Sequence, residues 1–197
     1  MADAMELLKK KILECGKALN SEVLLVDSFL NHQVDVELMN EIGKEFARLF
    51  KNDAITKVVT IESSGIAPAT MAAFHLGVPM VILKKAKSSI LSEGVIQTEV
   101  FSFTKRTSYQ LTLKGKFIEK GDRVLLIDDF LAQGEAAFGG ASIIKRAGGE
   151  VIGIGTVISK NFQPGIDRLR EAGYRVESLA QVSFMDENVI EFEDDDE

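Results

Sequence analysis

Residues 124–138 read VLLIDDFLAQGEAAF: a short apolar run, then two adjacent carboxylates, then a glycine loop and a helix-like segment. The apolar run predicts a buried strand that ends at Asp128 and Asp129. Adjacent carboxylates can accept hydrogen bonds from vicinal hydroxyls, or hold Mg²⁺ through water. A loop containing Gly134 can turn backbone N–H groups toward a phosphate at the N-terminus of the following helix. The stretch therefore predicts a site for a ribose 5-phosphate group, rather than an ordinary helix cap.

Short apolar runs alternate with helix-like segments over most of the chain. We expect strands at 57–61, 78–84, 123–129, 151–160 and 174–180, and helices at 36–50, 66–77, 134–147 and 165–173. This alternation predicts an α/β fold, with helices covering both faces of a parallel sheet. Residues 95–113 alternate apolar and polar side chains, which predicts two antiparallel strands joined near residues 104–106. Ligands of such sheets bind beyond the carboxyl ends of the strands, so three polar strand ends should face one crevice.

The composition limits the class of protein. Hydrophobic residues make up 46% of the chain and charged residues 27%, and the apolar runs are too short to span a bilayer. The N-terminus has no apolar block of the kind found in signal peptides, so we expect a cytoplasmic protein with no membrane partner. The net charge is −7, and six of the carboxylates lie in the acidic tail at 191–197. No basic excess remains for nucleic acid. The single cysteine, Cys15, is predicted to face the core.

The run VLLIDDFLAQGEA resembles the motif with which type I phosphoribosyltransferases bind 5-phosphoribosyl 1-pyrophosphate (PRPP). The resemblance implies one phosphoribosyltransferase domain over residues 1–197, with the type I α/β fold, a small N-terminal hood region and a flexible β-hairpin loop. It also implies that Asp128 and Asp129 are the catalytic residues, acting at the ribose hydroxyls. The implied 5′-phosphate loop is Ala132, Gln133, Gly134, Glu135 and Ala136, and the implied pyrophosphate loop is Ser63, Ser64 and Gly65.

Two acidic residues near these loops need an explanation. Many members of the family carry threonines in the phosphate loop, whereas this chain has alanines and Glu135 there. We expect Glu135 to point outward as an early helix residue. Glu62 precedes the pyrophosphate loop, and we expect it to face away or to assist Mg²⁺ through water. Lys84, Lys85 and Lys87 could neutralise the pyrophosphate or could form a solvated turn.

Five pieces, in order, together resemble the bacterial xanthine phosphoribosyltransferases: VDSFLNHQVD, TIESSGIAPA, VFSFTK, IDDFLAQGEAA, and ISKNFQPG followed by GYRVESLA. This resemblance implies that Leu24, Asn31 and Lys160 contact xanthine, and that residues from about 1 to 35 contribute to a hood over the base. It implies xanthine and PRPP as substrates, with Mg²⁺ bound through PRPP rather than by direct side-chain ligation. It also implies a homodimer working in purine salvage.

The chemistry of the base is consistent with this set of residues. Xanthine carries two keto groups and needs donors, which the ammonium of Lys160 and the amide of Asn31 can supply. Leu24 can contribute backbone groups, although core packing explains a leucine equally well. Two alternatives remain at this stage: an enzyme of the same class for guanine, hypoxanthine or adenine, and a PRPP-sensing regulator without catalysis. A regulator of that kind would carry a DNA-binding domain and a basic surface, and neither is evident in the sequence.

Overall fold

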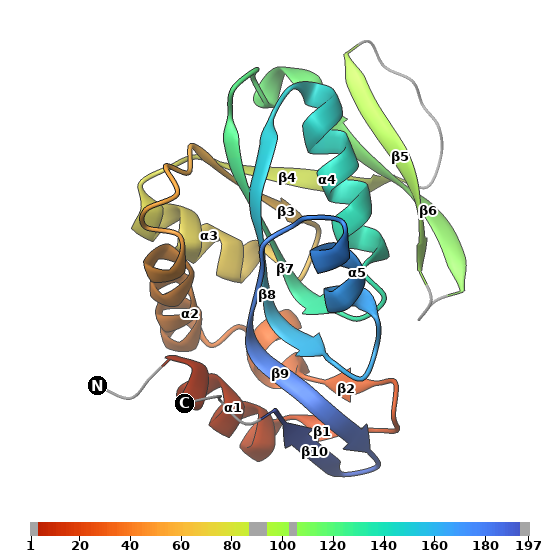
Figure 1. The fold of residues 1–197 in the computed structure, drawn as a ribbon. Helices are drawn as coiled ribbons and strands as arrows, with labels where there is room; N and C mark the ends of the chain where they lie inside the picture. Colours follow the sequence, from red (N-terminus) through yellow and green to blue (C-terminus); the bar gives the residue numbers. More distant parts are fainter. Residues whose placement is uncertain (1–3, 87–93, 103–105, 194–197) are drawn as a thin grey trace.

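The computed structural model describes residues 4–86, 94–102 and 106–193, and a mixed sheet runs through its centre (Figure 1). The strand order is β10-β9-β8-β7-β3-β4-β6-β5. The central strands β4, β3, β7, β8 and β9 run parallel, while β10, β6 and β5 pair antiparallel with their neighbours. The strands are β3 (Lys57–Ile61), β4 (Met80–Ala86), β5 (Val95–Ser102), β6 (Thr107–Lys114), β7 (Arg123–Leu131), β8 (Glu150–Lys160), β9 (Val176–Asp186) and β10 (Val189–Phe192).

Helices cover both faces of this sheet, as the alternating pattern predicts. Figure 1 shows α2 and α3 in one layer and α4 and α5 in the other. The helices are α1 (Ala4–Cys15), α2 (Val36–Leu49), α3 (Ile66–Leu76), α4 (Glu135–Ala147) and α5 (Gly165–Glu171). Shorter elements are β1 (Lys17–Ala18), β2 (Leu24–Leu25), a π-helical turn at Asp27–Asn31 and a 3₁₀ turn at Gly115–Phe117. The predicted α/β class is confirmed, with antiparallel strands added at both edges of the parallel sheet.

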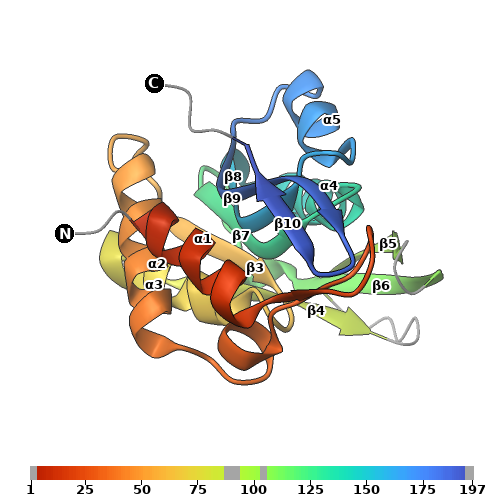
Figure 2. The same cartoon turned by 90° about the horizontal axis from the view of Figure 1, so that it is seen from below.

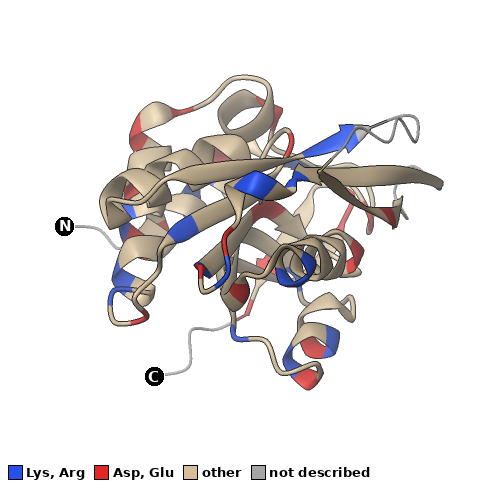
Figure 3. Ribbon diagram, turned by 90° about the horizontal axis from the view of Figure 1, so that it is seen from above, with Lys and Arg blue, Asp and Glu red and all other residues tan. Residues whose placement is uncertain are grey.

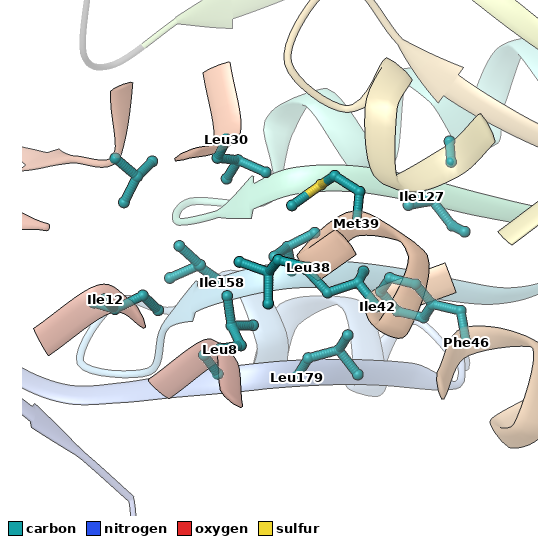
Figure 4. Packing of buried hydrophobic residues seen from close by; sticks show 14 of the residues in the cluster. Leu8, Ile12, Leu30, Leu38, Met39, Ile42, Phe46, Ile127, Ile158 and Leu179 are labelled. Atoms are coloured by element: carbon teal, nitrogen blue, oxygen red, sulfur yellow. The ribbon is translucent and has the colours of Figure 1, made fainter. Parts of the chain in front are cut away.

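Two apolar clusters hold the layers together, and β7 contributes to both. Leu125 and Ile127 belong to the cluster under α1, α2 and α3, whereas Val124 and Leu126 belong to the cluster under α4 and α5. This division follows from the two-residue repeat of a strand, because successive side chains point to opposite faces. Figure 4 shows the first cluster, where Ile127 lies among side chains of α2. A strand buried on both faces explains why its sequence reads as a continuous apolar run.

Several strands extend beyond their predicted ends, since β4 continues to Ala86 and β9 to Asp186. Strand β7 does not stop at its carboxylates, because Phe130 pairs with Ile158 and Leu131 with Ser159 on β8. The predicted acidic tail begins inside an ordered strand, since β10 pairs with β9 and includes residues 191 and 192. Exposed and half-buried side chains alternate along the four residues of β10, and this short pattern is hidden within a charge-rich sequence. Residues 194–197 lie outside the described part.

The N-terminal segment packs beside the last two strands (Figure 2). Strands β1 and β2 form a small antiparallel ribbon, and the backbone N–H of Asn188 donates to the carbonyl of Ala18 at 3.0 Å. Leu8 and Ile12 of α1 are fully buried. Cys15 is exposed, so the prediction that it faces the core is wrong. It is the last residue of α1, where the helix has already passed the apolar cluster that Leu8 and Ile12 reach.

Charges of both signs are spread along the elements (Figure 3). Among the described residues, none of the helices combines the length and the apolar character needed to cross a bilayer. The expected hairpin is present as β5 and β6, and its connecting residues 103–105 lie outside the described part.

Candidate active site

A cavity of about 700 Å³ opens at the carboxyl ends of β7 and β8. Asp128 and Phe130 of β7 and Thr156 of β8 line it on the sheet side, and the loop leading into α4 forms its floor. The β5–β6 hairpin supplies another wall through residues such as Phe101 and Tyr109. The cavity therefore occupies the position at which open α/β sheets bind their ligands.

Asp128 lies where the ends of β3 and β7 meet. A Cβ atom added to Gly65 would stand 2.9 Å from Oδ1 of Asp128 and 2.5 Å from Oγ1 of Thr60. Only glycine lets the loop after β3 come this close to the carboxyl group. Burial, followed by the negative charge of Asp129, raises the pKa of Asp128 well above its ordinary value. An ionised carboxylate at this point is costly until hydroxyl donors or positive charge arrive.

The two adjacent carboxyl groups contact each other. Asp128 lines the cavity, and the side chains of Asp128 and Asp129 are hydrogen-bonded to each other. The backbone N–H of Asp129 donates to Oδ1 of Asp128 at 3.0 Å. The structure therefore places Asp128 in the cavity wall and the side chain of Asp129 against it. Asp129 still influences the cavity through its charge on Asp128.

The predicted phosphate loop lies in the cavity wall. All five of its residues line the cavity: Ala132, Gln133, Gly134, Glu135 and Ala136. Gly134 has a φ of 87° and stands at the N-cap position of α4. This left-handed conformation favours glycine, and it places the start of α4 beside the cavity. The positive end of the helix dipole and the free N–H groups of its first turn suit an anion there.

Glu135 does not point freely outward as expected. Its Oε1 accepts a hydrogen bond from Nη1 of Arg168 at 2.7 Å, so its charge is paired across the gap between α4 and α5. The sequence gives no signal for this pair, because the partners are 33 residues apart.

The phosphate loop is also braced by the segment before α5. The backbone N–H of Gly165 donates to the carbonyl of Ala132 at 2.9 Å. A Cβ on Gly165 would stand 2.2 Å from that carbonyl oxygen and 2.9 Å from the backbone nitrogen of Gly134. Both neighbours are backbone atoms, so a side chain at this position must displace the loop.

We therefore expect Gly165→Ala to weaken the binding of a phosphate group at this loop by about tenfold to 100-fold, because displacements near 1 Å spoil a prepared binding geometry. Titration calorimetry with ribose 5-phosphate measures this effect. Gly115→Ala is the matched control, since its added Cβ would meet flexible side-chain atoms of Ile96 at 3.3 Å. Unchanged binding in Gly165→Ala would contradict the position given to the loop.

The predicted pyrophosphate loop forms the turn between β3 and α3. Gly65 is buried, Ser64 is half-buried and Ser63 is exposed. The peptide bond between Glu62 and Ser63 is cis. None of these three predicted residues lines the 700 Å³ cavity, but Gly65 adjoins it through its approach to Asp128.

Glu62 is turned back onto β4 rather than toward the cavity. Its carboxylate accepts the backbone N–H of Lys85 at 2.5 Å and pairs with the ammonium of Lys84 at 3.3 Å. Lys85 lines the cavity. The three predicted lysines therefore separate: Lys84 pairs with Glu62, Lys85 faces the site, and Lys87 lies outside the described residues.

None of the three predicted base contacts lines the 700 Å³ cavity, and only Lys160 adjoins one of its lining residues. The ammonium of Lys160 donates to the backbone carbonyl of Glu22 and lies 5.6 Å from the ring centroid of Phe130, which does line the cavity. Burial lowers the pKa of Lys160. Leu24 is buried within the apolar core, so only its backbone is available to a ligand. Asn31 ends the π-helical turn and is exposed.

Sequence reasoning missed Tyr109 as a site residue. Its half-buried ring lines the cavity, and the ammonium of Lys85 lies 5.3 Å from the ring centroid. Burial and the charge of Asp128 raise the pKa of Tyr109 to about 12, so its hydroxyl is a donor at neutral pH. The alternating pattern of β6 predicts that one face is covered, but not by what.

Among the described residues, no group of three or more His, Cys, Asp or Glu side chains could hold a metal ion. The cavity nevertheless presents a carboxylate at Asp128 and an anion-binding helix end a few residues later.

Residues 26–195 match the family model described as a phosphoribosyl transferase domain. The chain belongs to the phosphoribosyltransferase family. The chain is 56% identical over 188 residues to xanthine phosphoribosyltransferase 1 of Clostridium botulinum strain Hall, covering 95% of this chain and 99% of that protein. It is 53% identical over 188 residues to xanthine phosphoribosyltransferase of Bacillus cereus, covering 95% of each.

Solved structures of adenine phosphoribosyltransferases share the fold of this chain. Adenine phosphoribosyltransferase from Rhodothermus marinus matches with a TM-score of 0.73 at 28% identity, over 91% of this chain and 98% of that chain. The Giardia lamblia enzyme complexed with 9-deazaadenine matches in fold with a TM-score of 0.75 at 22% identity, over 88% of this chain and 97% of that one. The predicted family and fold are confirmed.

Proposed function

We propose that this protein transfers the 5-phosphoribosyl group of PRPP to N9 of xanthine, giving xanthosine 5′-monophosphate (XMP) and pyrophosphate. The observation that carries the proposal is the joint presence of Asp128 and the phosphate loop in one cavity of a phosphoribosyltransferase fold. The curated relatives that are more than half identical over nearly the whole chain, and are named for xanthine, support the choice of base.

The proposed roles follow from position. Residues 132–136 hold the 5′-phosphate through backbone N–H groups at the start of α4, and Asp128 accepts hydrogen bonds from the ribose hydroxyls. We also assign a catalytic role to Asp129, whose charge acts on the neighbouring carboxyl group of Asp128. Ser63, Ser64 and Gly65 hold the pyrophosphate in the turn that adjoins Asp128.

The reaction requires orientation and charge rather than a nucleophilic side chain. N9 of the base forms its bond to the anomeric carbon of PRPP as the bond to pyrophosphate breaks. Pyrophosphate leaves with the electron pair, and the imidazole ring of the base loses its N–H proton to water. Positive charge develops on the ribose ring in family chemistry of this type. The carboxylate of Asp128 stabilises that charge, and loop N–H groups stabilise the leaving group. The hairpin wall helps to exclude water, which would otherwise hydrolyse PRPP.

The base site is proposed at Lys160, Asn31 and the backbone of Leu24. Lys160 donates to a keto oxygen of xanthine after leaving the carbonyl of Glu22. Residues from about 1 to 35 serve as the hood, because Leu24 lies in β2 and Asn31 in the π-helical turn. Adenine carries an amine where xanthine has a keto group, so an ammonium donor disfavours adenine.

Mg²⁺ is proposed to arrive with PRPP, where it would neutralise charge on the leaving pyrophosphate. The oxygens of PRPP would hold the ion, and the carboxylate of Asp128 would contribute only through a water molecule. A cytoplasmic homodimer is proposed on the resemblance alone, and light scattering of the pure protein would test the dimer.

Pure protein with PRPP, Mg²⁺ and one purine at a time tests the proposed function. We expect nucleotide formation with xanthine at the highest kcat/KM, weaker activity with guanine and hypoxanthine, and little with adenine. A preference for adenine would contradict the base assignment. A lack of turnover with every base, combined with tight PRPP binding, would favour a PRPP-sensing regulator.

A further inference from the structure

The phosphate loop contains a carboxylate in a place where a phosphate would repel it. Glu135 is the first residue of α4, and like the rest of the loop it lines the cavity. An acidic residue in the first turn stabilises a helix, but here it competes with the incoming anion for the same positive helix end. Two negative groups this close repel each other strongly when they are partly shielded from water.

Arg168 of α5 compensates this charge. Its Nη1 donates to Oε1 of Glu135 at 2.7 Å and to the backbone carbonyl of Gln133 at 2.7 Å. Its guanidinium carbon lies 5.3 Å from the ring centroid of Phe138, one turn further along α4. The side chains of Glu135 and Arg168 are 32% and 41% exposed, so water screens the pair only in part.

The segment that carries Arg168 is itself fixed to the loop. The backbone N–H of Gly165 donates to the carbonyl of Ala132, and the side-chain amide of Gln133 donates to that of Gln163 at 3.3 Å. Arg168 does not line the cavity, whereas its partner Glu135 does. Any effect of Arg168 on a bound phosphate therefore passes through the loop, and not through direct contact with the ligand.

We propose that Arg168 is a positioning residue for the phosphoribosyl substrate. It neutralises Glu135, holds that carboxylate against α5, and fixes the carbonyl of Gln133 so that the loop presents N–H groups to the cavity. The inference rests on the proposed function, because it assigns the loop to the 5′-phosphate.

The test is a double-mutant cycle read by ligand binding, with Arg168→Ala, Glu135→Gln and the double variant. Ribose 5-phosphate probes the phosphate loop, and inorganic pyrophosphate probes the turn after β3; calorimetry gives both dissociation constants. We expect Arg168→Ala to weaken ribose 5-phosphate binding about tenfold and to leave pyrophosphate binding within about twofold. Glu135→Gln in the Arg168→Ala background should recover most of the loss, because the unpaired carboxylate is its main cause.

Arg170→Ala is the matched control, since Arg170 is an exposed arginine on the same helix. It should bind both ligands like the parent protein. A double variant as weak as Arg168→Ala would overturn the proposal, because the arginine would then act only as a structural brace. Equal weakening of both ligands would also overturn it. Failure of the parent protein to bind ribose 5-phosphate would instead count against the proposed function.

Discussion

Asparagine in place of Asp128 is expected to lower kcat about 100-fold or more, because the ring of the ribose would lose one charged contact in the transition state. The substitution keeps the shape of the side chain and removes only its charge. Asp128 lines the cavity, and a Cβ on Gly65 would stand within 2.9 Å of its Oδ1, so neither position tolerates much change in size.

The same variant should lose activity without losing stability. Burial and Asp129 raise the pKa of Asp128, so the folded protein holds this proton more tightly than the unfolded chain does. Its ionisation therefore opposes folding, and stability falls as pH rises from the unfolded pKa toward the folded one. Asp128→Asn removes that cost, and the melting temperature of the ligand-free protein at pH 8 should stay level or rise.

Kinetics over a pH range complete this test. The parent protein should gain kcat/KM for PRPP as pH rises through the raised pKa of Asp128, and Asp128→Asn should lose that limb of the profile. Asp186→Asn is the control, since Asp186 is exposed near the β9–β10 turn. An Asp128→Asn enzyme within a few-fold of the parent in kcat would remove Asp128 from the catalytic assignment.

The second large effect is expected at Lys160. Lys160→Met should lower kcat/KM for xanthine by about 10-fold to 100-fold, since hydrogen bonds from a charged donor contribute about 1.5–3 kcal/mol. KM for PRPP should change little, because Lys160 adjoins Phe130 but, unlike the phosphate loop, does not line the cavity. Burial already lowers the pKa of Lys160, so loss of the ammonium should not cost stability.

Comparing the activity of Lys160→Met with xanthine and with adenine tests the role of Lys160 more specifically. Methionine keeps the length of the side chain without a donor, so activity with adenine should not fall in parallel with activity with xanthine. Lys145→Met is a control, because Lys145 is in the last turn of α4, where its ammonium lies over the ring of Tyr174. Equal loss with both bases, or no loss with xanthine, would contradict the role of Lys160.

Much of the fold could be predicted because its central strands are buried on both faces. Strand β3 has the predicted bounds, and β8 begins one residue earlier than predicted. The two-residue and helical repeats carry this information locally. The end of β7 could not be predicted, because pairing with β8 continues the strand past Asp128 and Asp129. Strand β10 was hidden for a similar reason, since its pairing with β9 lies within an acidic segment.

In the candidate site, too, the features that are local in sequence could be predicted and the contacts between distant segments could not. The motif from Asp128 to Ala136 is continuous in sequence, and most of it does line one cavity. Contacts between distant segments had no local signal: Arg168 with Glu135, Lys160 with the carbonyl of Glu22, and the hairpin wall at Tyr109. The contact between the side chains of Asp128 and Asp129 is local, since the two residues are adjacent in the chain.

A crystal structure of the protein with XMP would decide whether one crevice holds the whole nucleotide. We predict the phosphate at residues 132–136, the ribose hydroxyls at Asp128, and the base between Lys160 and the hood, with Lys160 released from Glu22. A phosphate bound elsewhere, or a base remote from Lys160, would contradict that arrangement.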